Sequence, residues 1–321
     1  MGEMRAAIYD RYGPPEVLRI ANVERPQPRE GEVLVRVLTT SLNGGEIQGR
    51  SGRLRLVLGN RFPQRTGIDL VGEVVETGAG VQDMRSGQRV WGISENPIGT
   101  TAEYFAIRRS RLSAAPAGLT AAEAVTLLAG GTTALTALRE KAALKSGERL
   151  LVRGAAGGVG SLAVQIGKLL GAHVTATART SAIDFARSLG ADHVIDYTRV
   201  PLAEFGRFDV VLDTSGVDHR ALRRLLNPGG RMVAITIDMQ RRLASLAYLL
   251  ISTIHGPRRV RIFRGDPTPT LLTELAAMAE RGDVRPVIDQ VFPFDGIIAA
   301  HHAVEAGGVR GKHVIEIARP S

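Results

Sequence analysis

The first third of the chain carries short apolar runs, β-branched or alternating with polar residues, separated by Gly, Pro and charged turns. Runs of this length and spacing are typical of strands in a mixed barrel. The predicted strands are Arg5–Tyr9, Gly31–Thr39, Leu70–Thr77, Arg89–Ile93 and Ala102–Ile107. Residues 1 to about 117 are therefore expected to form a β-rich, barrel-like domain.

The hydrophobic pattern changes at Thr120. Ala121–Leu138 is rich in alanine and leucine, and Thr120 with Glu123 has the spacing of a capping box. Strands then alternate with helices, which predicts parallel pairing with right-handed crossovers. The predicted strands are Arg149–Val152, His173–Ala178, His193–Asp196, Asp209–Asp213 and Arg231–Ile235, with helices at Ser161–Leu170 and Ala182–Leu189.

The last part of the chain again has the short apolar runs that predict strands in the first part. Leu271–Arg281 is an amphipathic helix, and Phe294–Ala306 is a helix between the predicted strands Pro286–Phe292 and Lys312–Ala318. The chain is thus expected to leave its first domain and return to it. We assign residues 1–117 and 283–321 to one domain and residues 118–282 to the other.

The stretch Leu150–Gly160 reads LLVRGAAGGVG, an apolar run that ends in glycines just before a helical pattern. A strand, a tight turn and a helix N-terminus in this order expose backbone N–H groups where a phosphate can bind. Gly157 would let a pyrophosphate approach the backbone, and Gly160 would let the helix pack closely on the sheet. Ala155 stands at the first glycine position of the usual motif, and a purely structural turn is the alternative.

The end of the second predicted strand should decide which dinucleotide binds. An acidic residue there binds the ribose hydroxyl of NAD, whereas a basic one accommodates the 2′-phosphate of NADP. The strand runs into Arg179, Thr180 and Ser181, and no acidic residue follows before Asp184. The Arg179 guanidinium can pair with a phosphate and the two hydroxyls can donate to it, which favours NADP. A solvated loop arginine is the alternative.

Composition narrows the function classes. The 321 residues carry a net charge of +9 and no cysteine, which removes disulfides, thiolate nucleophiles and cysteine-ligated zinc. No apolar run of membrane-spanning length occurs, and charges at Glu3, Arg5 and Asp10 interrupt the start of the chain where a signal peptide would need an apolar core, so we expect a cytoplasmic protein without a membrane partner. The basic clusters Arg50–Arg65 and Arg258–Arg264 contain one aromatic residue each, Phe62 and Phe263, and no repeated interleaving of aromatics, which disfavours nucleic acid as a partner.

A metal site is not expected. All seven histidines lie at or beyond position 173, and the predicted barrel offers only carboxylates such as Glu46, Asp69 and Glu73. Zinc needs closely spaced nitrogen, sulfur or oxygen donors. His301 and His302 are adjacent on a helix, so they point in different directions and are expected to be solvated or partly buried.

Motifs along nearly the whole chain resemble those of the medium-chain dehydrogenase/reductase superfamily, and within it the zinc-independent quinone oxidoreductases (zeta-crystallin-like). The matching segments are the opening Tyr12–Leu18, Asn43 with Glu46, Gly67–Val75, Gly99–Tyr104, Gly130–Ala137, Ala155–Gly160, Ala186–Tyr197 and Gly311–Ile317. Their order is that of the family. Many relatives carry a lysine where this chain has Ile183, which leaves Arg179 more of the phosphate contact.

The resemblance implies a Rossmann doubly wound parallel sheet inserted in a GroES-like β-barrel catalytic domain, with NADPH in the cleft between them. It places Ala156, Gly157, Gly158 and Val159 at the pyrophosphate, Arg179, Thr180 and Tyr197 at the adenosine end, and Ile235, Thr236 and Phe263 on the nicotinamide side. Substrate loops are expected at 49–60 and 241–261. Relatives of this kind are often homodimers, so we expect one here.

Without a metal, the simplest reaction is hydride delivery from NADPH to a quinone or an α,β-unsaturated carbonyl, whose conjugation spreads the developing charge. By the family match, Asn43 is the first candidate hydrogen-bond donor to the acceptor, and Tyr104 is the second. Two alternatives remain: an enoyl-thioester reductase on the same fold, and a non-enzymatic nucleotide- or RNA-binding crystallin-like protein.

Overall fold

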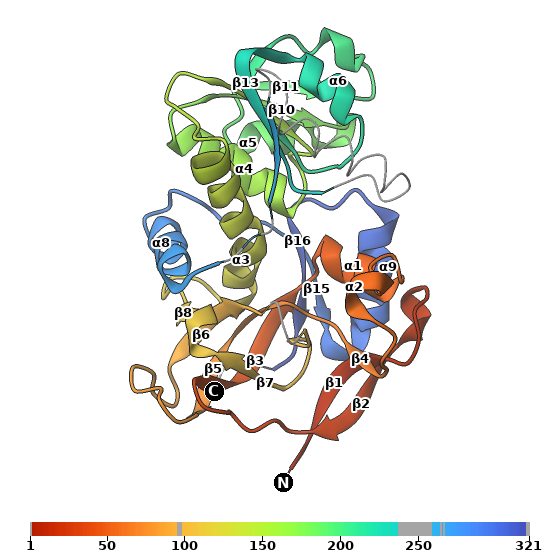
Figure 1. The fold of residues 1–321 in the computed structure, drawn as a ribbon, viewed down its shortest axis with the longest axis vertical. Helices are drawn as coiled ribbons and strands as arrows, with labels where there is room; N and C mark the ends of the chain where they lie inside the picture. Colours follow the sequence, from red (N-terminus) through yellow and green to blue (C-terminus); the bar gives the residue numbers. More distant parts are fainter. Residues whose placement is uncertain (1, 95–97, 237–258, 264, 266, 319–321) are drawn as a thin grey trace. The chain divides into compact units, whose positions relative to one another are not determined.

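The computed structural model describes residues 2–94, 98–236, 259–263, 265 and 267–318 (Figure 1). The chain divides into two compact units, which are described separately. Unit 1 comprises Met1–Ala129, Pro267–Gly282 and Pro286–Ser321, and unit 2 comprises Gly130–Asp266 and Asp283–Arg285. Each unit carries one part of the chemistry that the sequence predicts.

Unit 2 is built on a six-stranded parallel sheet in the order β11-β10-β9-β12-β13-β14. The strands are β9 (Arg149–Arg153), β10 (His173–Ala178), β11 (His193–Asp196), β12 (Phe208–Asp213), β13 (Leu226–Ala234) and β14 (Arg259–Ile262). Because β9 lies between β10 and β12, the strand order reverses beside it, and ligands of such sheets bind at that point. The doubly wound sheet expected from the alternating pattern is confirmed.

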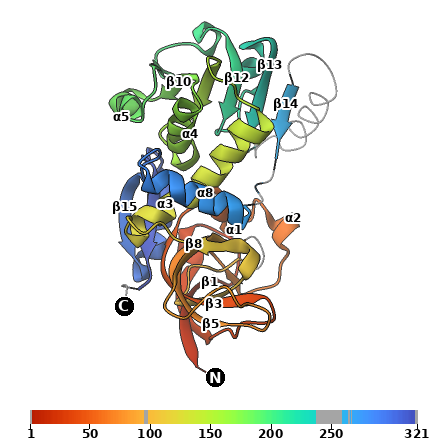
Figure 2. The same ribbon diagram turned by 90° about the vertical axis from the view of Figure 1, so that its left-hand side faces the viewer.

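Three helices of unit 2 connect these strands: α4 (Gly158–Leu169), α5 (Ile183–Ser188) and α6 (His219–Arg224). Figure 2 shows α4 alongside the sheet. Leu150, Leu151 and Val152 of β9 are fully buried, as expected of a parallel strand that is covered on both faces. This burial explains why the central strand reads as a continuous apolar run.

Unit 1 is β-rich, with a three-stranded sheet (β2-β1-β4) and a seven-stranded sheet (β15-β16-β3-β5-β6-β8, with β7 on β3). The strands are β1 (Glu3–Tyr9), β2 (Leu18–Glu24), β3 (Glu32–Ser41), β4 (Gln64–Arg65), β5 (Asp69–Thr77), β6 (Arg89–Ile93), β7 (Tyr104–Arg108), β8 (Leu112–Ala114), β15 (Ile288–Pro293) and β16 (Lys312–Glu316). The helices α1 (Gly44–Arg50), α2 (Arg55–Leu58) and α9 (Ile297–Ala306) also belong to it. Since β16 pairs with β3, the predicted return of the chain is confirmed.

The predicted helix after Thr120 is α3 (Ala121–Leu135), which continues as a wider, π-helical turn over Thr136–Lys141. Its capping box is present: the Glu123 carboxylate accepts from the Thr120 backbone at 2.8 Å, and the Glu123 N–H donates to Thr120 Oγ1 at 3.2 Å. By length and composition, Ala121–Lys141 could cross a membrane, contrary to our expectation that no stretch qualifies. Its most apolar window is 78% buried, as in a core helix.

The division of the chain differs from the expected boundaries at two elements: α3, whose residues up to Ala129 belong to unit 1, and α8 (Pro269–Glu280). We expected α8 in the inserted domain, but it packs on β8 in unit 1 (Figure 2). Ser113 and Thr273 share a hydrogen bond of 2.8 Å between their hydroxyls, and the Ala117 N–H donates to Glu280 at 2.9 Å. These polar contacts and the buried leucines of α8 tie it to the barrel.

Candidate functional site

The glycine turn of unit 2 follows β9 directly. Gly154 has a φ of +80°, a conformation that side chains disfavour, whereas Ala155 is fully buried. Thus the backbone reverses at Gly154, and an alanine is tolerated at the next position. The Ala155 N–H donates to the Thr177 carbonyl of β10 at 3.2 Å, which holds the turn against the neighbouring strand.

Backbone donors are available at the start of α4. Gly157 is the N-cap residue and no side chain caps the helix, so the N–H groups of Gly158, Val159 and Gly160 have no intrahelical acceptor. A Cβ built on Gly157 would have only one neighbour within 4 Å, the Gly154 oxygen at 3.7 Å. Gly157 has an ordinary φ of −77°. The chain itself therefore does not require glycine here, and the open space suits a pyrophosphate.

Gly160 is required for packing. A Cβ at this position would lie 2.1 Å from the Gly154 oxygen and 2.8 Å from the Ala155 Cα, so α4 can approach the turn only with glycine here. We expect Gly160→Ala to lower the free energy of unfolding by at least about 2 kcal/mol, because backbone cannot move aside as a side chain can. Chemical denaturation checks this value. Gly118→Ala is the matched control, since nothing lies within 4 Å of a Cβ there, and equal stability of the two variants would contradict the packing role.

The strand after the turn, β10, leads to the predicted adenosine end. Arg179 follows β10 directly, is exposed and has no ion-pair partner among the residues that the structure describes. Arg187 and Arg199, by contrast, pair with Asp184 at 3.0 Å and with Asp196 at 3.6 Å. A guanidinium that is free of carboxylates can bind a phosphate without first breaking an ion pair.

Thr180 is engaged by a carboxylate that the sequence reading did not consider. Its hydroxyl donates to Asp196 Oδ2 at 2.5 Å, while Thr198 donates from its hydroxyl to Oδ1 at 2.6 Å. These hydrogen bonds lower the pKa of Asp196. The Thr180 hydroxyl proton therefore points at Asp196 and not at a phosphate, and phosphate binding by Arg179 stays a prediction. Tyr197 follows β11 and is 48% exposed, so its ring is accessible.

The residues predicted for the nicotinamide side lie at the far strands of the same sheet. Ile235 follows β13, where its N–H donates to the Asp213 carbonyl of β12 at 3.1 Å, and Thr236 is half-buried beside it. Phe263 follows β14, with the Lys141 ammonium 5.9 Å from the centre of its ring. Most of the predicted loop 241–261 lies outside the described residues.

Sequence reasoning missed Asp213 at the carboxyl end of β12. Its carboxylate is fully buried and accepts from Ser215 N at 3.0 Å, Ser215 Oγ at 2.7 Å and Gly216 N at 3.0 Å. His219 Nε2 lies 3.0 Å from Oδ2. Asp213 thereby fixes the loop that follows β12, next to the reversal of strand order. The signal in the sequence is the D-T-S-G turn at 213–216.

In unit 1, Asn43 lies in a buried polar network between β3 and α1. Its amide nitrogen lies 3.0 Å from Ser41 O, from Glu46 Oε1 and from Asp69 Oδ2, and its amide oxygen accepts from Lys312. The amide has two hydrogens and three acceptors, and Asn43 is 9% exposed. As a donor to a substrate, Asn43 remains a prediction that requires one of these bonds to open.

The second catalytic candidate, Tyr104, lies elsewhere in unit 1. It belongs to β7 and packs against an apolar cluster that includes Met4 and Ala102, with the Arg25 guanidinium 4.1 Å from its ring centre. Within the described residues, no hydrogen bond links Tyr104 to the Asn43 network. The structure therefore does not bring the two catalytic candidates together.

Arg50 and His301 are more buried than the sequence suggested. Arg50, in the expected substrate loop 49–60, is only 1% exposed and donates to the Gly13 carbonyl and to Glu305, so its guanidinium is held in the interior of unit 1. His301 is fully buried and burial lowers its pKa to about 3, whereas His302 is exposed and lies 2.7 Å from Glu16. The pair is thus split between core and solvent, and neither residue joins the network of Asn43.

The donor set of this network does not fit zinc. Within the described ranges, no three His, Cys, Asp or Glu side chains are placed to hold a metal ion. Glu46 and Asp69 are the carboxylates nearest to Asn43, and the Lys312 ammonium already lies among them. An ammonium and two carboxylates without nitrogen or sulfur ligands are unlike a catalytic zinc site.

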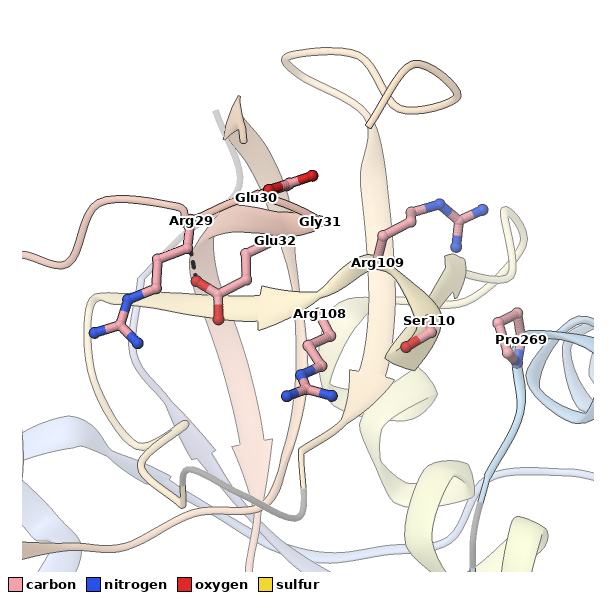
Figure 3. Close-up of a pocket in the computed structure, with 8 residues that line it drawn as sticks. All are labelled: Arg29, Glu30, Gly31, Glu32, Arg108, Arg109, Ser110 and Pro269. Atoms are coloured by element: carbon pink, nitrogen blue, oxygen red, sulfur yellow. Dashed lines mark hydrogen bonds between the residues drawn. The ribbon is translucent and has the colours of Figure 1, made fainter. Parts of the chain in front are cut away.

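A surface hollow on unit 1 is a weaker candidate. It is lined by the turn at Glu30–Glu32, by Arg29, Arg108, Arg109 and Ser110, and by Pro269 (Figure 3). The three guanidinium groups point in different directions, and Arg109 is bonded to Asp83 at 2.6 Å. Convergent polar groups mark a binding site, and this hollow lacks them.

Comparison with known proteins finds sequence matches that cover both units. Residues 29–147 match the alcohol dehydrogenase GroES-like domain, and residues 189–315 match the zinc-binding dehydrogenase family. The chain is 34% identical to a 2-methylene-furan-3-one reductase of Solanum lycopersicum, over 98% of this chain and 79% of that protein. It is 32% identical to an NADPH-dependent alkenal/one oxidoreductase, chloroplastic, of Arabidopsis thaliana, with the same coverage of each chain, 98% and 79%.

Among solved structures, a quinone oxidoreductase from Coxiella burnetii has a TM-score of 0.89 and 30% sequence identity, covering 99% of this chain and 100% of that one. The agreement extends over both units and over the return of the chain to the barrel. The chain therefore belongs to the medium-chain dehydrogenase/reductase superfamily, in its quinone oxidoreductase-like branch.

Proposed function

We propose that this oxidoreductase is a metal-independent, NADPH-dependent reductase that transfers hydride to a quinone or an α,β-unsaturated carbonyl. The observation that carries the proposal is the combination of an uncapped α4 N-terminus with an exposed Arg179 at the adjacent strand end, which has no ion-pair partner among the described residues. The printed names of the relatives, an alkenal/one oxidoreductase and a furanone reductase, support the acceptor class.

The residues of unit 2 fit NADPH. The N–H groups of Gly158, Val159 and Gly160 would bind the pyrophosphate, with open space at Gly157 for its approach. Arg179 would bind the 2′-phosphate, and Tyr197 would lie at the adenosine. When bound, NADPH supplies the hydride. The residues around it hold the cofactor and take no part in the electron transfer itself.

The remaining requirement is to stabilise the oxygen of the acceptor as it gains negative charge. A conjugated acceptor spreads that charge and needs only orientation and hydrogen bonding, which a polar network of protein side chains can supply. The resemblance places Asn43 at the acceptor, and water would deliver the proton that completes the reduction. In this proposal no metal is needed to polarise the acceptor, because its conjugation spreads the charge. Glu46 and Asp69 accept hydrogen bonds from Asn43 and are not arranged as metal ligands.

Steady-state NADPH oxidation with three acceptors tests the function: a benzoquinone, a small enone and an enoyl-coenzyme A. Turnover with the quinone or the enone, unchanged after treatment with a chelator, is the expected result. Preference for the enoyl-coenzyme A would instead support the enoyl-thioester reductase. If the protein oxidised NADPH with none of the three acceptors, a reductase function would be contradicted, and the non-enzymatic nucleotide-binding alternative would remain.

We also propose that the chain forms a homodimer through β14, one of the two edge strands of the parallel sheet that the described residues form. An edge strand offers unpaired backbone groups to a second copy, and Ile262 at its end is 39% exposed. Light scattering on the purified protein is expected to give twice the mass of the 34.3 kDa chain. A monomer mass at micromolar concentration would contradict the proposal.

A further inference from the structure

Lys312, the first residue of β16, has a buried ammonium in unit 1. The residue is 7% exposed, and its Nζ donates to Asn43 Oδ1, to Ser41 Oγ at 3.2 Å and to the Leu42 carbonyl at 3.2 Å. All three ammonium hydrogens therefore have acceptors. Burial lowers the pKa of Lys312, and the carboxylates of Asp69 and Glu46 oppose this effect and favour the charged form.

The bonds around Lys312 close into a cycle. Ser41 Oγ, which accepts from Lys312, donates to Asp69 Oδ2 at 2.6 Å, and Ser41 N donates to Oδ1 at 2.7 Å. Asp69, whose side chain is fully buried, also accepts from the Asn43 amide at 3.0 Å, and Asn43 accepts from Lys312. The Lys312 ammonium and the Asp69 carboxylate are thus connected by hydrogen bonds through the side chains of Ser41 and Asn43, and not by a direct ion pair.

The cycle determines how the Asn43 amide is oriented. An ammonium can only donate and a carboxylate can only accept, so the amide oxygen must face Lys312 and the amide nitrogen must face Asp69 and Glu46. Glu46 is the last member of the network, since it accepts from Asn43 at 3.0 Å and from the Thr66 hydroxyl at 3.2 Å. Without the ammonium, the amide oxygen would lose its one hydrogen-bond partner among the described residues, and the orientation would depend on the acceptors of the amide nitrogen alone.

We propose that Lys312 is a positioning residue for the reduction: its buried ammonium orients Asn43 and sets whether the neighbouring Glu46 carboxyl carries a proton. The proposal rests on the function proposed above, in which Asn43 contacts the acceptor. Lys312, from the C-terminal part of the chain, would thus contribute to the reduction through Asn43, without contacting the acceptor itself.

The charges around Glu46 support this role. Burial and the Asp69 carboxylate raise the pKa of Glu46 to about 7, while Lys312 opposes them. The other ionisable group facing it from a packed strand is Tyr9 of β1, whose own pKa burial raises to about 12, so Tyr9 is neutral near pH 7. On the helix of Glu46 itself, Arg50 is paired with Glu305. Lys312 and Asp69 are therefore the two charges that control Glu46.

Lys312→Met tests the proposal because methionine keeps the length of the side chain and removes the charge. The kcat is expected to fall about tenfold or more while the Kd for NADPH changes less than about twofold, since Lys312 lies outside unit 2. The midpoint of Glu46 protonation, followed by infrared difference spectroscopy against Glu46→Gln, is expected to rise by about one pH unit. The pH profile of kcat should shift in the same direction.

The double variant Lys312→Met/Asp69→Asn separates positioning from a merely structural role. It removes the opposing charge as well, so the Glu46 midpoint should return toward that of the unchanged protein while kcat stays low, because Asn43 is still not oriented. This variant also carries the test if Lys312→Met alone does not fold. Lys168→Met is the matched control, since Lys168 pairs with Asp192 at 2.6 Å in unit 2, and it should leave both readouts unchanged.

Two outcomes would overturn the inference: an unchanged Glu46 midpoint in Lys312→Met, or an unchanged kcat with the midpoint shifted. Failure of the proposed function looks different, because then the unaltered protein reduces no acceptor. In that case a shifted infrared midpoint would still support control of Glu46 by Lys312, and an unshifted one would refute it.

Discussion

Replacing Gly157 with valine is expected to weaken NADPH binding at least about 100-fold, which corresponds to about 2.7 kcal/mol. The branched side chain would fill the open space at the start of α4 and keep the pyrophosphate from the backbone N–H groups. The fold should survive, because a Cβ at this position meets only one atom, at 3.7 Å. Isothermal titration calorimetry measures the affinity, and circular dichroism measures the melting temperature.

A graded series sharpens this test. Gly157→Ala adds only the tolerated Cβ and should weaken binding less than Gly157→Val does. Gly118→Val is the control, because Gly118 also has open space around a Cβ but lies in unit 1, outside the proposed site. If Gly157→Val bound NADPH with unchanged affinity, the turn would be structural and the pyrophosphate site would be elsewhere.

Replacing Arg179 with alanine should lower kcat/KM for NADPH but not for NADH. Only NADPH carries the 2′-phosphate, and a charge-assisted hydrogen bond is worth about 1.5–3 kcal/mol, so kcat/KM for NADPH is expected to fall about 10- to 150-fold. The value for NADH should stay within about twofold. Stability should not change, since Arg179 is exposed and makes no ion pair with another described residue.

Arg187→Ala is the matched control for this variant. Arg187 is an exposed arginine on α5, close in sequence to Arg179, but it is paired with Asp184 at 3.0 Å. It should affect NADPH and NADH equally and slightly. An equal loss for both cofactors in Arg179→Ala would show that the arginine supports the loop and does not bind the 2′-phosphate.

The regular elements of both units could be predicted from the sequence where periodicity and turns agreed. β6, β10 and β11 have the predicted bounds, and Thr120 with Glu123 forms the predicted capping box. Short helices such as α1 and α6 were missed. Their six or seven residues are too few for a helical repeat, and their glycines or charges look like loop.

The glycine turn after β9 could be predicted because its geometry is local. A strand end, a tight turn and a helix start follow one another within a dozen residues, so the sequence alone located the backbone donors at the start of α4, while phosphate binding there stays a prediction. Thr180 shows the limit of local reasoning. Its hydroxyl is engaged by Asp196 from the next strand, and pairing between parallel strands cannot be inferred from either residue alone.

The Lys312 network could not be predicted, because Lys312 is far along the chain from Asn43 and Asp69, and the motifs that contain these residues do not show which side chains meet. The order of polar and apolar residues along β16 does not show that the side chain of its first residue, Lys312, points into the interior of unit 1. One indirect signal exists: only four of the 41 basic residues are lysine. A compact ammonium suits three converging acceptors better than the broad guanidinium of arginine.

The return of the chain to unit 1 has a consequence for how the protein is made. β3 and β16 are neighbours, and the hydrogen bond between Asn43 and Lys312 spans 269 positions, so the buried charges of Asp69 and Glu46 stay uncompensated until residue 312 has been synthesised. The strands of unit 2 all lie between those positions and need nothing from beyond Arg285. On the ribosome, the nucleotide-binding half can therefore fold first, while the barrel half has to wait for its closing strand.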